Sequence, residues 1–330
     1  MSTRAESAPG VDPELALIYG AYPVPAVLTP EMIPTLRAAQ ATLYNEDTMT
    51  ATHPISHKEY SFKSYDGYEV TASVFTPTGS TTHSNSSRPC IYYIHGGGLI
   101  MGNRFLGIDI TYPLAVELGA VVISIEYRLA PEHKAPSASE DAYAGLLWAT
   151  RNSATLGIDP KRILVWGSSS GGGLAAALGL MVRDRKPSCG LHLKGLLLHY
   201  PMLDNLVDED DKTTFSSRAA PAWSSETHKM AWEQYLGSKS SRFAQDPHVV
   251  PARAKDLSRL PPVLVDVGSA ELFRRPAAKF AQRIWEAGGL VEVHVAGGAF
   301  HGSDLIATDA RVTKRAIQAR TSWGRDMFES

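Results

Sequence analysis

The sequence predicts an α/β fold in which helices cover both faces of a mostly parallel sheet, and three observations point to this class. From residue 90 onward, short apolar runs typical of buried strands alternate with segments of helical character. One run is followed by a glycine-rich turn with a serine at its centre and then by a helix. Another run ends in three consecutive glycines. The predicted strands are 90–94, 121–125, 163–166, 193–198, 263–267 and 291–295.

Composition and charge limit the class of protein. The 330 residues suit one large α/β domain or two small ones, and we expect a single domain over 1–330. A net charge of −2 indicates neither nucleic acid nor an anionic membrane as a partner. The chain has no apolar run of about 18 residues to span a membrane, and its polar N-terminus does not resemble a signal peptide. Cys90 and Cys189 lie far apart without metal-ligand spacing, so we expect buried thiols, a reducing, cytoplasmic location and no metal site.

The segment 1–50 has helical or irregular character and no strand pattern. One helix is predicted to begin at Pro13 with Asp12 as its cap, and another to occupy 30–43. We interpret this segment as a packed N-terminal arm, with part of a lid as the alternative.

Residues 57–76 predict a β-hairpin. Alternating apolar residues flank Asp66 and Gly67, and an Asp-Gly pair in this setting is a strong turn signal. The polar stretch 78–88 that follows is expected to be a mobile loop.

An insertion at about 203–250 interrupts the alternation of strands and helices. It contains the acidic run Asp208–Asp211, followed by Trp223, Trp232 and Tyr235 on a predicted helix. Because it is longer than an ordinary connection, we expect it to form a cap above the ligand-binding edge of the sheet, together with part of 1–50. The alternative is an ordinary connecting helix.

The G-x-S-x-G pattern places Ser169 between a predicted strand and a predicted helix. In that context the pattern is a nucleophile elbow, a sharp turn that exposes the serine hydroxyl above the sheet. A serine hydroxyl needs a neighbouring base to take its proton. His301 is the favoured base because it follows the last predicted strand. His294, within that strand, is interpreted as structural, and His199 is a weaker rival.

The acid that orients the base is predicted to be Glu271. It is the first carboxylate after the end of strand 263–267, and it precedes His301, as the chain order serine, acid, histidine requires. Asp266 lies within the strand and is interpreted as structural. Asp304 is the rival, with capping of a helix as its other role. The alternative for Glu271 is a surface ion pair with one of the arginines that follow it.

Backbone amides for a developing oxyanion are predicted from the run His95–Gly98. Three glycines after a strand let N–H groups point inward without side chains in the way. We expect the N–H groups of Gly97, Gly98 and Ser170 to form the oxyanion hole. The run contains neither Gly-Lys-Ser/Thr nor G-x-G-x-x-G, so a phosphate site is the weaker interpretation.

Taken together and in order, these motifs resemble the hormone-sensitive-lipase family of α/β-hydrolases over about residues 55–320. The motifs that carry the resemblance are His95–Gly98, Tyr127–His133, the elbow around Ser169, Tyr200-Pro201, Gly268–Glu271 and Phe300–Gly302. The resemblance implies an eight-stranded, mostly parallel sheet, a helical cap and a Ser–acid–His triad without metal or organic cofactor.

Three features depart from the family pattern. Ser168 and Ser170 flank the nucleophile where relatives often have aspartate and alanine. The acid is a glutamate instead of the commoner aspartate. Arg274 and Arg275 follow it where an Arg-Asp pair is frequent, which removes an expected second carboxylate.

The resemblance implies a serine hydrolase acting on a small to medium carboxylic ester or a lactone. Acyl transfer or lactone processing in a biosynthetic pathway is an alternative because it uses the same residues. A third alternative is a non-catalytic receptor similar to the plant gibberellin receptors, which keep the pocket but lose the histidine. The presence of His301 argues against it.

Overall fold

The computed structural model of the chain describes residues 10–21, 27–51, 53–78, 87–206, 222–238 and 241–330. The polar loop predicted as mobile lies mainly outside these ranges, as does the acidic run of the insertion. Among the described helices, none combines the length and apolar character needed to cross a bilayer.

One eight-stranded sheet forms the centre of the described structure, with strand order β1-β2-β4-β3-β5-β6-β7-β8. The first two strands are antiparallel to their neighbours, and the others are parallel. The strands are β1 (Ile55–Lys63), β2 (Glu69–Pro77), β3 (Arg88–Ile94), β4 (Val121–Ile125), β5 (Ile158–Ser168), β6 (Leu193–His199), β7 (Val263–Gly268) and β8 (Val291–Ala296).

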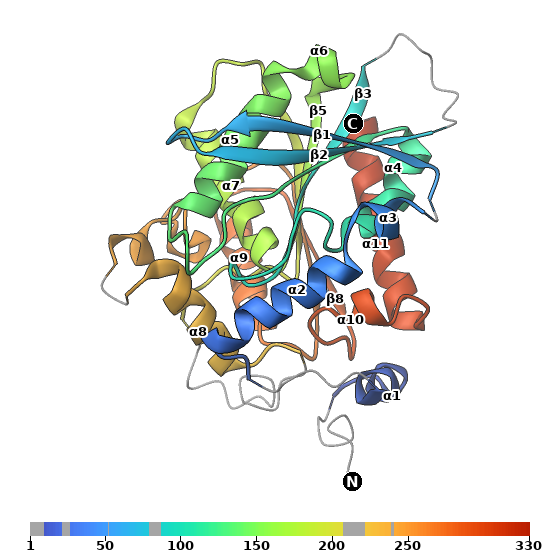
Figure 1. The fold of residues 1–330 in the computed structure, drawn as a ribbon, viewed down its shortest axis with the longest axis vertical. Coiled ribbons are helices and arrows are strands. Elements are labelled where there is room, and N and C mark those ends of the chain that lie inside the picture. The colour runs from blue at the N-terminus through green and yellow to red at the C-terminus, as the bar shows by residue number, and fades with distance from the viewer. Residues whose placement is uncertain (1–9, 22–26, 52, 79–86, 207–221, 239–240) are drawn as a thin grey trace.

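Helices connect the strands and cover the sheet (Figure 1). The α-helices are α1 (Pro13–Ala21), α2 (Ile33–Leu43), α3 (Glu46–Thr50), α4 (Tyr112–Leu118), α5 (Ser137–Arg151), α6 (Ser153–Leu156), α7 (Ser170–Arg185), α8 (Ser225–Leu236), α9 (Arg274–Glu286), α10 (Ser303–Ile306) and α11 (Arg311–Glu329). Short 3₁₀ helices are η1 (Pro30–Met32), η2 (Ile108–Thr111), η3 (Arg242–Gln245) and η4 (Pro251–Arg253).

The core has two main layers because strand residues alternate between the two faces of the sheet. On β3, Tyr92 packs into the cluster shared with α5, α7 and α9, whereas Tyr93 packs into the cluster shared with α4 and α11. Both side chains are almost fully buried. The parallel centre of the sheet is therefore covered on both faces, as the apolar runs predicted.

The first hairpin and the first helix form as their sequences predicted. The β1–β2 turn places Gly67 at φ +85°, a conformation that glycine adopts without strain. The side chain of Asp12 accepts a hydrogen bond from the N–H of Glu14 at 2.9 Å, which satisfies a free donor in the first turn of α1.

Several expectations need correction. Trp223 precedes α8, which begins at Ser225 and is capped by the Ser224 hydroxyl. The strand predicted at 163–166 begins earlier, at Ile158. Both cysteines are free, but only Cys90 is buried and Cys189 is half-buried.

Helices α1, α2 and α8 gather at one end of the molecule, at the bottom of the view in Figure 1. Hydrogen bonds attach α8 to the segment that precedes α2, and α2 to the sheet loops. The N–H of Leu28 donates to the Thr227 hydroxyl of α8 at 2.9 Å. Arg37 of α2 donates to the carbonyl oxygens of Ile100 and Ala130, which lie in the loops after β3 and β4.

Candidate active site

Ser169 lies at the sharp turn between β5 and α7. Its backbone has φ 58° and ψ −119°, a strained conformation for a residue with a side chain. A side chain on Gly167 would overlap the backbone of Gly171, and one on Gly171 would overlap the carbonyl of Ile94. The two glycines are therefore required by the turn, as the elbow pattern predicted.

Three side chains from distant parts of the chain meet at this turn. Ser169 Oγ lies 2.9 Å from His301 Nε2, and His301 Nδ1 lies 2.7 Å from Glu271 Oε2. A carboxylate oxygen accepts, so Nδ1 carries the proton and Nε2 offers a lone pair to the serine hydroxyl. This is the arrangement in which an imidazole can remove a proton from serine.

The glutamate is enclosed. Glu271 is 2% exposed, and its second oxygen accepts a hydrogen bond from the N–H of Gly268 at 2.7 Å. Arg274 donates to the carbonyl of Ser269 at 2.7 Å. Both Glu271 oxygens thus face partners inside the protein, and a surface ion pair does not describe this group.

The rival residues have other partners. Asp304 pairs with Arg320 at 2.9 Å and lies 3.0 Å from the His199 ring. Asp266 pairs with Arg320 at 3.0 Å and with His294 at 2.6 Å. The two rivals, His199 and Asp304, therefore belong to a separate network and not to the chain of hydrogen bonds that contains His301. Asp266 and His294, which were interpreted as structural, belong to the same network.

The glycine loop after β3 borders the elbow. Gly97 and Gly98 have φ of 114° and 64°, where a side chain is strained. A side chain on Gly98 would also overlap the ring of Trp223. The hydroxyl of Tyr127 donates to the carbonyl of His95 at 3.0 Å and holds the start of the loop. The donor roles of Gly97, Gly98 and the Ser170 amide stay predictions.

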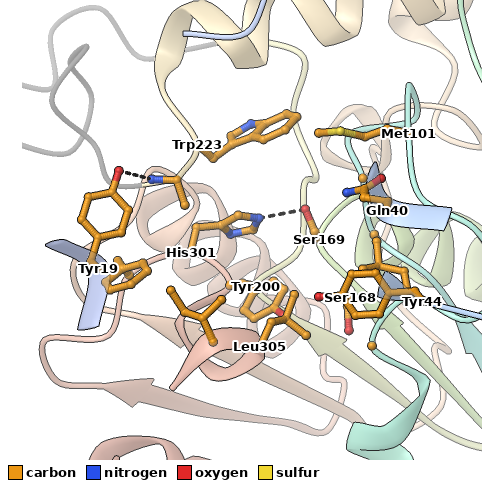
Figure 2. A pocket seen from close by; sticks show the side chains of 18 of the residues that line it. Tyr19, Gln40, Tyr44, Met101, Ser168, Ser169, Tyr200, Trp223, His301 and Leu305 are labelled. Carbon is orange, nitrogen blue, oxygen red and sulfur yellow. Dashed lines mark hydrogen bonds between the residues drawn. The ribbon is translucent and has the colours of Figure 1, made fainter. Parts of the chain in front are cut away.

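A cavity of about 270 Å³ opens above Ser169 (Figure 2). Its lining is mostly apolar and aromatic and includes no aspartate, glutamate, lysine or arginine from the described residues. The lining residues are Tyr19, Gln40, Tyr44, Tyr93, Gly96, Gly97, Met101, Leu106, Gly107, Ser168, Ser169, Tyr200, Ala222, Trp223, Phe300, His301, Gly302, Leu305 and Ile306.

Two of the tyrosines that line the cavity are buried. Burial raises the pKa of Tyr93 and of Tyr200 well above the ordinary value for a tyrosine. Within the described residues, no group of three histidine, cysteine or carboxylate side chains gathers as a metal site would require.

Part of the cavity wall, which we call the upper wall, comes from segments remote from Ser169 in sequence. Tyr19 on α1, Gln40 on α2 and Tyr44 line it, and none of them was predicted as a site residue. The Tyr19 hydroxyl accepts a hydrogen bond from the N–H of Ala222 at 3.3 Å, which joins α1 to the insertion. We call α1, α2 and residues 222–236 the covering segments.

Only one of the three aromatic residues singled out in the insertion reaches the cavity. Trp223 lies above His301, with ring centroids 6.3 Å apart. Trp232 and Tyr235, on α8, are buried in the main core cluster and do not line the cavity. Trp232 and Tyr235 therefore lie on a face of α8 that packs against the core.

Comparisons with known proteins show which family the chain resembles. A family model described as the α/β-hydrolase fold matches residues 91–305. The chain is 32% identical to "Esterase LipI" of Mycobacterium tuberculosis over 72% of this chain and 74% of that protein. It is 29% identical to "Carboxylesterase NlhH" of the same organism over 97% of this chain and 98% of that protein.

Solved structures agree with the sequence relatives. "Bacterial Heroin Esterase" superposes with a TM-score of 0.87 at 33% identity, covering 98% of this chain and 100% of that one. The esterase LipW of Mycobacterium marinum gives 0.86 at 29% identity, covering 98% of each chain. These matches place the chain among carboxylesterase-type serine hydrolases. The chain therefore belongs to the hormone-sensitive-lipase family of α/β-hydrolases.

Proposed function

We propose that this protein hydrolyses carboxylic esters through a triad of Ser169, His301 and Glu271. One observation carries the proposal, the continuous line of hydrogen bonds from Ser169 Oγ through both ring nitrogens of His301 to Glu271. A non-catalytic receptor of this fold would lack the histidine. Here His301 is present and hydrogen-bonded to Ser169.

In this mechanism Ser169 attacks the ester carbonyl carbon while His301 Nε2 takes the serine proton. Glu271 holds the ring in the correct tautomer and stabilises the imidazolium. The oxygen of the tetrahedral intermediate accepts hydrogen bonds from the N–H groups of Gly97, Gly98 and Ser170. His301 then returns the proton to the leaving alcohol, and water releases the acid from the acyl-enzyme by the same steps.

The substrate we propose is an uncharged ester or lactone with a small to medium acyl group. The uncharged, mostly apolar lining supports this choice, because a charged ligand would be desolvated there without a partner. We propose that about 1–50 and about 203–250 act as the cap of a single domain and select the substrate. Acyl transfer to a second alcohol uses the same steps and is detected by adding an acceptor alcohol and measuring the new ester.

The test is a panel of p-nitrophenyl esters of increasing chain length with Ser169→Ala. The variant is expected to lose about 10⁴–10⁶-fold in kcat on every ester. Ser124→Ala is the matched control, since Ser124 is also a buried serine but lies within β4, away from the cavity. Near-normal turnover by folded Ser169→Ala contradicts the proposal.

A further inference from the structure

A buried arginine on the last helix lies behind the proposed triad. Arg320 of α11 is 1% exposed. Its guanidinium pairs with Asp266 at 3.0 Å and with Asp304 at 2.9 Å, and its Nη1 also contacts Nε2 of His199. One side chain therefore joins the ends of β6 and β7 to α10.

The contact with His199 leads directly to the elbow. The His199 carbonyl accepts a hydrogen bond from the N–H of Ser169 at 2.9 Å. On the ring, Nδ1 lies 3.2 Å from the hydroxyl oxygen of Ser168, which lines the cavity. Arg320 is thus linked to the nucleophile Ser169 through one intervening residue, His199.

The two aspartates lead to the other members of the triad. Asp304 follows His301 by one helical turn and accepts a hydrogen bond from the Tyr200 hydroxyl at 3.2 Å. The Tyr200 ring in turn packs edge-on against the His301 ring, with centroids 4.7 Å apart. Asp266 lies on β7, and Glu271 follows shortly after the end of that strand. Each triad residue is therefore connected to the same guanidinium.

The ring of His199 is enclosed by the same charged groups. Its Nε2 contacts Nη1 of Arg320 and lies 3.0 Å from Oδ2 of Asp304. Burial, and then the Arg320 charge, lower the pKa of His199. The ring is therefore held between the guanidinium and one of the carboxylates that pair with it.

We propose that Arg320 is a positioning residue of the active site, which holds the three segments that carry Ser169, His301 and Glu271 in register. The proposal rests on the proposed function of the triad. Arg320 does not line the cavity, so it acts on the geometry of catalysis and not on substrate contact.

The effect expected from its loss is a lower kcat. Without the guanidinium, Asp266 and Asp304 lose their common partner, and the segments that carry His301 and Glu271 are free to shift. Misplacement of a reacting group by about 1 Å costs roughly 10²-fold in rate. KM is expected to change little, because the lining of the cavity is retained.

The experiment compares Arg320→Met with Arg128→Met on p-nitrophenyl acetate. Arg128 is also buried and pairs with two aspartates, Asp66 and Asp141, but these do not line the cavity. Both variants remove a buried cation from two carboxylates and are expected to lower the melting temperature. Arg320→Met is expected to lose about 10–100-fold in kcat with KM within about 3-fold, whereas folded Arg128→Met keeps kcat within about 3-fold.

A second pair of variants keeps the proposal testable if Arg320→Met does not fold. His199→Gln offers polar atoms that can hydrogen-bond to Arg320 and to Ser168, whereas His199→Leu offers none. We expect His199→Leu to lose kcat by at least about 10-fold, and His199→Gln to restore most of it. Equal losses in the two variants overturn the proposal.

The outcomes separate this proposal from the function on which it rests. If Ser169→Ala retains turnover in the same assay, the proposed triad fails. If Ser169→Ala is inactive while Arg320→Met and Arg128→Met have equal kcat, the triad stands and the positioning role of Arg320 is overturned. A selective loss of kcat in Arg320→Met supports it.

Discussion

The lower and upper walls of the pocket are built in different ways. The lower wall consists of residues at strand ends, and its geometry is set by short stretches of chain such as the turn around Ser169. The upper wall consists of single side chains from the covering segments, such as Tyr19 and Trp223, which lie about 200 residues apart. No local motif determines where these side chains point.

From this difference we expect the rate of the reaction and the choice of substrate to depend on different sets of residues. The strand-end residues hold the proposed reacting groups within hydrogen-bonding distance of one another. In the proposed function, the covering segments contact the rest of the ligand. Variants of the lower wall should change the rate on every ester, and variants of the upper wall should change the ranking of esters.

After Ser169→Ala, the largest effect is expected for Glu271→Gln in the lower wall. The amide cannot stabilise the imidazolium and favours the wrong tautomer of His301, so kcat should fall roughly 10³–10⁴-fold on all esters. Asp304→Asn and Asp266→Asn should lose less, because neither carboxylate contacts the His301 ring. Steady-state kinetics of the three folded variants decide the order, and an inactive Asp304→Asn beside an active Glu271→Gln shows that the acid is misassigned.

An intermediate effect is expected for Trp223→Leu in the upper wall. Removal of ring contacts should change kcat/KM on long-chain or bulky esters by about 10-fold, with a smaller change on an acetate ester. Trp232→Leu is the matched control, because Trp232 is buried in the core without reaching the cavity. That variant should lower the melting temperature but keep the ranking of esters. If the two variants change the ranking equally, the distinction between them is wrong.

The smallest effect on ester hydrolysis is expected at His228 of α8, whose role concerns stability in acid. His228 is buried, donates from Nε2 to the Asp204 carbonyl at 2.9 Å, and has its pKa lowered to about 4 by burial. In the unfolded chain a histidine titrates near 6.5, so between these values the unfolded state binds more protons. The stability contributed by neutral His228 is therefore complete above about pH 6.5 and is lost as the pH falls toward 4, amounting to about 3 kcal/mol.

His228→Gln tests this directly, because glutamine keeps the donor but cannot be protonated. Urea unfolding at pH 7 and at pH 4.5 should show a smaller loss of stability in the variant than in the wild type. Ester hydrolysis at pH 7 should be nearly the same in both. Parallel loss of stability in the two proteins contradicts the assignment to His228.

The lower wall could be predicted from sequence because its signals are local. Gly167 and Gly171 are needed by the turn itself, and the order of serine, acid and histidine along the chain follows the order of strand ends. The contacts of Ser169, His301 and Glu271 agree with that expectation, whereas their catalytic roles stay a proposal.

The upper wall could not be predicted in the same way. Whether Trp223 or Trp232 faces the ligand depends on how α8 packs on the core, which no periodicity in the insertion reveals. Tyr19 reaches the cavity because α1 packs against the segment that carries His301, with the Tyr19 and Phe300 rings 5.0 Å apart. Arg320 was also missed, since its partners lie on strands and helices far from it in sequence.

The central claim is that Ser169 is the nucleophile, and covalent labelling tests it most directly. The intact protein is treated with a phosphonate that reacts with activated serines, and the modified peptide is identified by mass spectrometry. We predict one label per chain, on Ser169, with loss of ester hydrolysis in proportion to labelling and no label in Ser169→Ala. Labelling of Ser168 or another residue with full loss of activity, or full activity in completely labelled Ser169, would contradict the account.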